Sequence, residues 1–154
     1  MKNLLWVFFI SMLPVVELRA AIPVGTGLGL PFWLNAPAAM LGNLLPVPFI
    51  LLFIPKILDW LGKFRWFAPV VNWLHKKAEK HSEKIVRSAF WGLLLFVMIP
   101  CPGTGAWTGS LVAALFNLPK RRAFLAVALG VLGCAVIMTL ASYGILGFLS
   151  FLLK

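Results

Sequence analysis

Acidic and catalytic side chains are scarce in this sequence of 154 residues. Lysine and arginine together number 14, whereas aspartate and glutamate together number 4, and there are only two histidines and one tyrosine. The four acids are Glu17, Asp59, Glu79 and Glu83. A nucleophile, a base and an orienting group cannot be assembled from so few side chains. We therefore predict that the protein is not an enzyme.

Metal-binding and redox patterns are also missing. Cys101 and Cys134 lie far apart, with no CxxC motif or Cys/His cluster around either. His75 and His81 are not at the i, i+4 spacing of a helical metal pair, and they stand among lysines. The sequence predicts no metal and no cofactor, and it favours both cysteines as small packing residues.

Long uncharged stretches are what the sequence has instead. Hydrophobic residues make up 62% of the chain, and the mean hydropathy is +0.98. Four uncharged runs hold nearly three quarters of the chain: 3–16, 20–55, 88–119 and 123–153. These runs exclude a soluble enzyme, a nucleic-acid-binding domain and a disordered basic tail. They predict an all-α integral membrane protein, in which the net charge of +10 reflects topology and lipid contact.

The N-terminus resembles a signal peptide, with Lys2, an apolar run and small residues at positions 20 and 21. Glu17 and Arg19, however, occupy the region where a cleavage site is small and neutral. We therefore expect this segment to stay in the protein.

Two of the uncharged runs have the wrong length for simple spans. A spanning helix needs roughly 20 residues, and two spans with a turn need about 40 or more. The run 88–119 falls between these lengths, and Pro100 and Pro102 interrupt it. The run that starts the chain is broken in the same way near Pro23 and Gly25. We predict a re-entrant helical hairpin at each place, with these residues at the hairpin tips.

The basic residues indicate which side of the membrane each segment faces. Eight of them lie in 56–87, and Lys120, Arg121 and Arg122 follow the second broken run. The positive-inside rule puts both clusters in the cytoplasm, which requires 88–118 to enter and leave by one face. Both termini are then outside, and we expect a prokaryotic cytoplasmic membrane. Unpaired backbone groups are tolerated at membrane depth only inside protein or a wet cavity, so the two tips should face each other.

The two halves of the chain look alike. Residues 22–27 (IPVGTG) match 99–105 (IPCPGTG), and each continues to an Asn-x-Pro, at 35–37 and at 117–119. An inverted repeat of two units, each a hairpin followed by one transmembrane helix, explains this pattern and is typical of secondary transporters. The alternative is that Gly and Pro are simply common in membrane helices. The predicted segments are hairpin 1–35, helix 36–55, linker 56–87, hairpin 88–118, helix 120–143 and tail 144–154.

The linker has helical periodicity. Apolar residues recur every three or four positions, at Trp60, Phe64, Phe67, Val71, Leu74 and Ala78, and most lysines lie off that stripe. This predicts an amphipathic helix in the cytoplasmic interface that joins the two units.

Glu17 and Arg19 are the strongest functional candidates. Ionisable residues within a membrane segment are costly and by default mark a pathway or a site. The alternatives are a position at the membrane surface or a pair that involves only these two residues. If they are intramembrane, Arg19 suits an anionic substrate group, because guanidinium binds phosphate or carboxylate through two parallel bonds. Glu17 is then the group that couples transport to protons or sodium.

The second hairpin offers complementary groups. Gly103, Thr104 and Gly105 precede a predicted half-helix from Ala106 to Leu115, whose N-terminal amides attract anions. We also assign substrate contacts to Thr108, Gly109, Arg121 and Arg122, the last two at the cytoplasmic mouth, where they could equally be topology determinants alone.

Residues 17–25 (ELRAAIPVG) and 100–109 (PCPGTGAWTG) resemble the two signatures of the small multidrug export protein family. The resemblance covers nearly the whole chain. That family is similar to the DedA superfamily and its VTT-domain relatives, which implies two opposed re-entrant hairpins and the movement of lipids. It assigns Glu17 and Arg19 to the charged first hairpin and Gly103 to Gly109 to the second. The chain is shorter than DedA proteins and has a single intramembrane acid.

Three functional hypotheses follow. The first is a carrier of an anionic lipid, either a polyprenyl phosphate or a phospholipid, and the second is a proton-coupled exporter of small drugs. The third is a non-transporting membrane scaffold that acts through 60–84. We expect membrane lipids as partners, no nucleic acid, and a homo-oligomer. Ala126, Gly130 and Cys134 form a small-residue ridge that could be the seam between copies or could pack within one chain.

Overall fold

The computed structural model describes residues 2–64, 69, 83–101 and 103–152. Its helices are α1 (Lys2–Met12), α2 (Glu17–Gly27), α3 (Phe32–Leu44), α4 (Pro46–Leu61), α6 (Glu83–Met98), α7 (Ala106–Leu115) and α8 (Lys120–Leu152). No strand occurs within the described residues. The all-α prediction is confirmed, and so is the predicted half-helix from Ala106 to Leu115.

Within the part of the chain that the structure describes, two helical segments are long and apolar enough to cross a bilayer. One covers 30 residues, Phe32–Leu61, because Leu45 keeps helical dihedrals between α3 and α4. The other is Lys120–Gly144 within α8. Large apolar side chains also cover the outer surface, among them Trp6, Leu41 and Leu140, each more than half exposed. Such a surface is unfavourable in water and favourable in lipid, and it fits an α-helical membrane protein.

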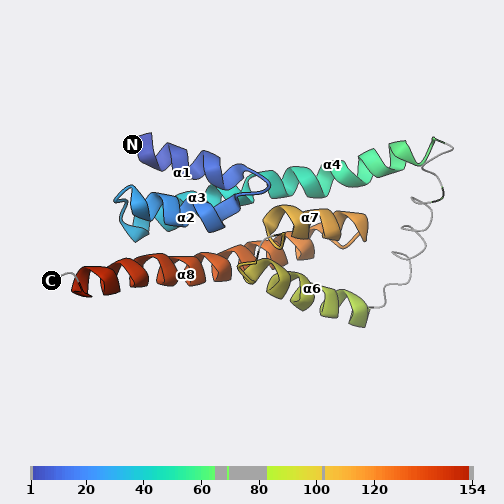
Figure 1. The fold of residues 1–154 in the computed structure, drawn as a ribbon. Coiled ribbons are helices and arrows are strands. Elements are labelled where there is room, and N and C mark those ends of the chain that lie inside the picture. The colour runs from blue at the N-terminus through green and yellow to red at the C-terminus, as the bar shows by residue number, and fades with distance from the viewer. Residues whose placement is uncertain (1, 65–68, 70–82, 102, 153–154) are drawn as a thin grey trace.

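The shorter helices form two hairpins that enter from opposite ends of an elongated molecule (Figure 1). α1 and α2 occupy the end that also holds the end of α8, and α6 and α7 occupy the end where α8 begins. α4 and α8 run in opposite directions along the length of the molecule. The turn between α1 and α2 and the segment between α6 and α7 meet near the middle. The two hairpins therefore contact each other tip to tip.

The first hairpin does not turn where the sequence suggested. The turn lies at residues 13–16, whereas Pro23 and Gly25 lie inside α2. Proline inside a helix removes one N–H bond and its ring clashes with the carbonyl four residues earlier, yet α2 continues through Pro23. Gly25 serves close packing, since a Cβ there would lie 2.7 Å from the Asn35 amide nitrogen. Assigning these two residues to the hairpin tip was wrong.

The same type of helix ending occurs in both halves of the chain, at positions 88 residues apart. Gly29 follows α2 and Asn117 follows α7, both with positive φ, of 74° and 49°. Each end carries the same paired bonds: Leu30 N–H to the Gly25 carbonyl at 3.0 Å, and Leu118 N–H to the Ala113 carbonyl at 2.9 Å. This is the Schellman motif, in which a left-handed residue closes the helix. Leu-Pro then precedes the next helix in both halves.

This register corrects the pairing of the two Asn-x-Pro motifs. Asn35 is fully buried inside α3, whereas Asn117 is an exposed turn residue. The residue in the first half that does the work of Asn117 is Gly29. Asparagine is the residue that most often replaces glycine in the left-handed region, which accounts for the exchange.

A second feature recurs at the same separation. Gly42 of α3 lies under the Phe8 carbonyl of α1, and Gly130 of α8 lies under α6, where a Cβ would be 2.8 Å from the Leu94 carbonyl oxygen. Glycine allows each pair of backbones to approach closely. The ridge of Ala126, Gly130 and Cys134 is buried in the chain, so it packs within the protomer.

Most of the predicted interfacial helix falls outside the described residues, and so does Pro102. Of the apolar stripe of that predicted helix, the structure describes Trp60 and Phe64, and both are exposed.

Candidate functional site

Glu17 begins α2 at the point where the two hairpins meet. Its backbone is left-handed, with φ of 50°, and its side chain is only 4% exposed. The carboxylate accepts a hydrogen bond from the Trp107 backbone N–H at 3.1 Å, and the Ala106 amide interacts with it as well. Both amides belong to the first turn of α7, which has free N–H groups. Glu17 therefore caps a helix of the opposite hairpin.

Gly105 makes this contact possible. It is the residue before α7, so it stands where Ser, Thr, Asn or Asp would normally cap the helix with its own side chain. A Cβ at Gly105 would overlap the Glu17 carboxylate. Its φ of 170° is ordinary extended backbone, so close approach, and not strain, selects glycine here.

Arg19 lies two residues further along α2 and reaches into the same opposite hairpin. Its guanidinium donates to the carbonyls of Ile99, at 3.0 Å, and Cys101. It also donates to the Thr104 hydroxyl at 2.9 Å. These three oxygens lie in the irregular segment that follows α6, where carbonyls have no helical partner. The Arg19 Nε is buried without a hydrogen-bond partner.

Trp107 closes the junction from the other direction. Its indole N–H donates to the carbonyl of Met12, the last residue of α1, at 3.1 Å. Each hairpin tip therefore binds the other: side chains of α2 bind backbone of the second hairpin, and a side chain of α7 binds backbone of the first. Buried polar groups need such partners, because an unpaired one is costly.

The arrangement binds a buried acid and a half-buried cation largely through backbone dipoles. The α7 amides, predicted to attract an anion, already hold the Glu17 carboxylate. An anionic ligand at this point would compete with that carboxylate for the amides, and with three protein oxygens for the Arg19 guanidinium.

A polar network on the first half was not predicted from the sequence. The Asn35 amide nitrogen contacts the Ile22 carbonyl at 2.8 Å, the Tyr143 hydroxyl at 3.0 Å and the Thr26 hydroxyl at 3.3 Å. Tyr143 in turn donates to the Leu30 carbonyl at 2.6 Å, so the network ties α2 and α3 to α8. The signal available was a polar residue in an apolar run, at Asn35, and the only tyrosine of the chain.

The other predicted site residues are spread over the second half. Thr104 and Gly105 lie at the junction, and Gly103, with φ of 84°, forms the exposed turn beside them. Gly109 packs against α6, where a Cβ would be 2.6 Å from Val97. Thr108 is half-buried on α7, and Pro100 is exposed. Arg121 and Arg122 are exposed at the start of α8, at the end of the molecule remote from α1.

No group of three or more potential metal ligands occurs among the residues that the structure describes. Two buried asparagines there keep unpaired atoms: the Asn35 Oδ1, and both amide atoms of Asn43.

The helices and the buried charged junction define an α-helical membrane protein with two opposed helical hairpins. This chain belongs to the family described as "Putative small multi-drug export protein", whose model matches residues 17–137. The matched range starts at Glu17, directly after the first turn, and includes Arg19 and the segment between α6 and α7. A search of curated proteins and a search of solved structures found no match.

Proposed function

We propose that the protein carries an anionic lipid, a polyprenyl phosphate or a phospholipid, across the bilayer between the two hairpin tips. The observation that carries this proposal is the half-buried Arg19 guanidinium between the opposed hairpins, which lies beside the Thr104 hydroxyl and whose Nε is buried without a hydrogen-bond partner. A fixed cation at membrane depth is costly, and it is retained where it binds a charged group in transit.

Helix length supports a re-entrant form for both hairpins. α1 and α2 have 11 residues each, α7 has 10, and the apolar part of α6 is limited to Ser88–Met98. At ~1.5 Å per residue such helices reach roughly 16 Å, about half of the ~30 Å hydrocarbon core. We place the tips near the midplane and the linker with Lys120–Arg122 in the cytoplasm, which leaves both termini outside.

The separation of 88 residues supports an inverted repeat. Glu17 and Gly105 are also 88 residues apart, and the Glu17 carboxylate lies against Gly105. A residue that touches its own counterpart lies on the two-fold axis relating the two copies. We infer that the pseudo-two-fold axis passes through this contact. In transporters built from inverted repeats, the substrate site lies at such an interface.

Transport then requires Arg19 to exchange partners. A phosphate would replace the Ile99 and Cys101 carbonyls as the acceptor of the guanidinium, with Thr104 as an additional donor. Glu17 is the coupling group of this proposal, because a proton or sodium ion on its carboxylate would weaken its hold on α7.

Reconstituted vesicles test the proposal. Phosphatidylcholine vesicles receive the protein and a trace of headgroup-labelled phosphatidylglycerol, or a labelled short polyprenyl phosphate, and an impermeant reductant bleaches the outer label. The parent should expose inner label to the reductant. Arg19→Lys keeps the charge but loses the planar fork, and it should slow exposure by roughly tenfold.

Lys56→Ala is the matched control, since it removes an exposed cation from α4 and should leave the rate unchanged. Thr104→Val removes the hydroxyl with little change of volume and should slow transport less than Arg19→Lys. Parent-like transport of both anionic lipids by Arg19→Lys would exclude the assignment.

Proton-coupled export of small drugs is the second candidate. The family description and the buried acid at the junction favour it. Cells that contain the protein should then extrude a cationic dye faster than cells without it, and Glu17→Gln should abolish the difference. Equal dye efflux in cells with and without the protein would argue against export.

A further inference from the structure

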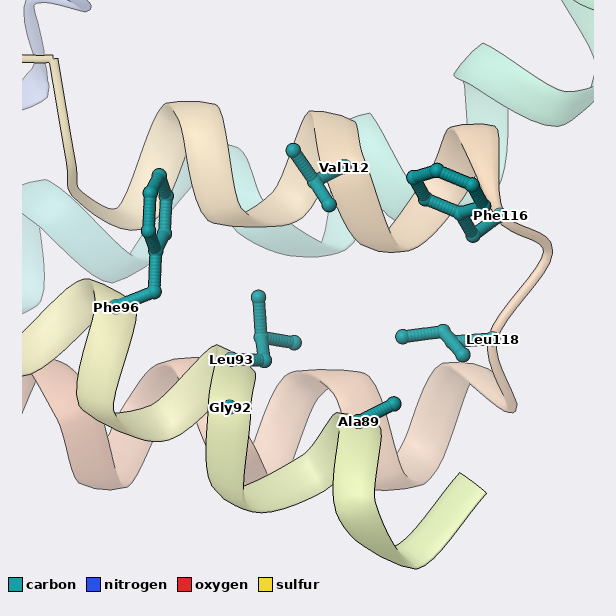
Figure 2. A pocket seen from close by; sticks show the side chains of 7 residues that line it. All are labelled: Ala89, Gly92, Leu93, Phe96, Val112, Phe116 and Leu118. Atoms are coloured by element: carbon teal, nitrogen blue, oxygen red, sulfur yellow. The ribbon is translucent and has the colours of Figure 1, made fainter. Parts of the chain in front are cut away.

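The second hairpin contains an apolar groove between α6 and α7 (Figure 2). Its volume is about 330 Å³, which lies within the ~300–1,000 Å³ typical of small-molecule sites. The lining residues are Ala89, Gly92, Leu93, Phe96, Val112, Phe116 and Leu118. All of these side chains are apolar, so the groove suits a hydrocarbon.

The groove ends beside a cation. A smaller adjoining hollow shares Leu93 and Leu118 with it and adds Arg122, which is exposed at the start of α8. At the opposite end lies Phe96 (Figure 2), three residues before Ile99, whose carbonyl binds Arg19. The groove therefore extends from the Arg122 end of α8 toward the hairpin junction.

Gly92 lines the groove and has open space beside it. Gly105, Gly109 and Gly130 each have a neighbour that a Cβ would meet, but a Cβ at Gly92 would meet nothing within 4 Å. Glycine inside a helix costs about 1 kcal/mol relative to alanine. Gly92 is exposed, so a larger side chain there would project into open space at the groove without meeting the rest of the chain.

We infer that this groove holds the hydrocarbon chain of an anionic lipid, with the phosphate of that lipid at Arg122. An apolar groove that ends at an arginine matches a molecule with a long apolar chain and one negative headgroup. The inference rests on the proposed function for the role of this lipid as cargo, and it adds the route of the chain. The lipid then enters at Arg122 and follows α6 and α7 toward Arg19.

Photolabelling tests the groove without requiring transport. Phosphatidylcholine vesicles with the protein receive phosphatidylglycerol that carries a diazirine in one acyl chain, and mass spectrometry maps the labelled residues. Label should concentrate on the α6 and α7 residues that line the groove. Gly92→Leu fills the groove and improves helix propensity, so the variant should fold. Labelling of its groove residues should be at least roughly fivefold lower than in the parent.

Gly144→Leu is the matched control. Gly144 also lies inside a helix with open space around its Cα, but it is on α8 outside the groove. Groove labelling of the Gly144→Leu variant should equal that of the parent. Arg122→Gln should lower labelling by phosphatidylglycerol severalfold and leave the weaker labelling by a diazirine phosphatidylcholine unchanged.

Equal groove labelling of Gly92→Leu and the parent would overturn the inference, as would equal labelling by the two lipids in the parent. Failure of the proposed function looks different. Specific groove labelling with no lipid transport would refute the carrier and leave the groove as a lipid site. Transport that depends on Arg19, with labelling indifferent to Gly92→Leu, would refute the groove alone.

Discussion

The two hairpins differ in what they bring to the junction. The first supplies charged side chains, Glu17 and Arg19. The second, from residue 88 to 119, has no charged residue and supplies neutral groups: amides at the start of α7, carbonyls after α6, the Thr104 hydroxyl and the Trp107 indole. Helix ends carry unpaired dipoles. Opposed broken helices can therefore hold charged side chains of one hairpin with neutral groups of the other, without a second set of charges.

The largest effect should come from removing the close approach between the hairpins. Gly105→Ala places a Cβ on the Glu17 carboxylate and should lower the free energy of unfolding by roughly 3 kcal/mol. Thermal unfolding in detergent measures this. In a Glu17→Gly background the same substitution should cost less than about 1 kcal/mol, because the clash is gone. Equal costs in both backgrounds would show that the two residues are uncoupled.

Removing the cation should cost somewhat less. Arg19→Ala removes the charged hydrogen bonds to the carbonyls of Ile99 and Cys101, which keep only their neutral donors, and should destabilise the protein by roughly 2 kcal/mol. Lys56→Ala, at an exposed position, should leave the unfolding temperature unchanged. If both variants unfold like the parent, the contacts of Arg19 contribute nothing to holding the tips together.

The two asparagines sharpen the comparison between the halves. Asn35→Leu removes the donor that serves Ile22 and Tyr143 and should cost roughly 1–2 kcal/mol. Asn117→Gly should be neutral, since glycine adopts positive φ freely. Chemical unfolding of both variants in the same detergent is the measurement. A larger loss at Asn117 than at Asn35 would contradict the assignment of Asn35 to a buried network and of Asn117 to a turn.

The smallest change is at the edge of the polar network. Tyr143→Phe removes the hydroxyl that donates to the Leu30 carbonyl, with little change of volume, and should cost about 1 kcal/mol. In the Asn35→Leu background the loss should be smaller, because Tyr143 has already lost one partner. Strictly additive losses in the double variant would mean that the two residues do not act as a network.

The sequence was sufficient to predict the helical class and to single out Glu17, Arg19, Thr104 and Gly105, which meet at the junction, but it did not predict the part of Trp107. Charges isolated in apolar runs identify Glu17 and Arg19, and the Pro-Gly pattern identifies the partner segment. The first turn was misplaced because proline and glycine have two uses. Pro23 is tolerated within α2, and Gly25 accommodates the Asn35 side chain. Spacing along one chain does not reveal which side chain approaches a glycine.

The register of the halves was missed for a related reason. Gly29 and Asn117 both close a helix with positive φ, although they are different residue types. The Asn-x-Pro motif that begins at Asn35 resembles the one at Asn117 in sequence only, and this resemblance gave the wrong alignment. The polar network of Asn35 joins residues more than a hundred positions apart, and local pattern carries no trace of such a contact.

The contact of Glu17 with Gly105 has an evolutionary consequence under the proposed repeat. In a dimer of identical half-length chains, a residue on the axis faces its own copy, so a carboxylate there would face a second carboxylate. Two like charges at such a distance do not both ionise readily. Fusing the halves into one chain frees the two positions to diverge, and only then can one become an acid and the other the glycine that makes room for it.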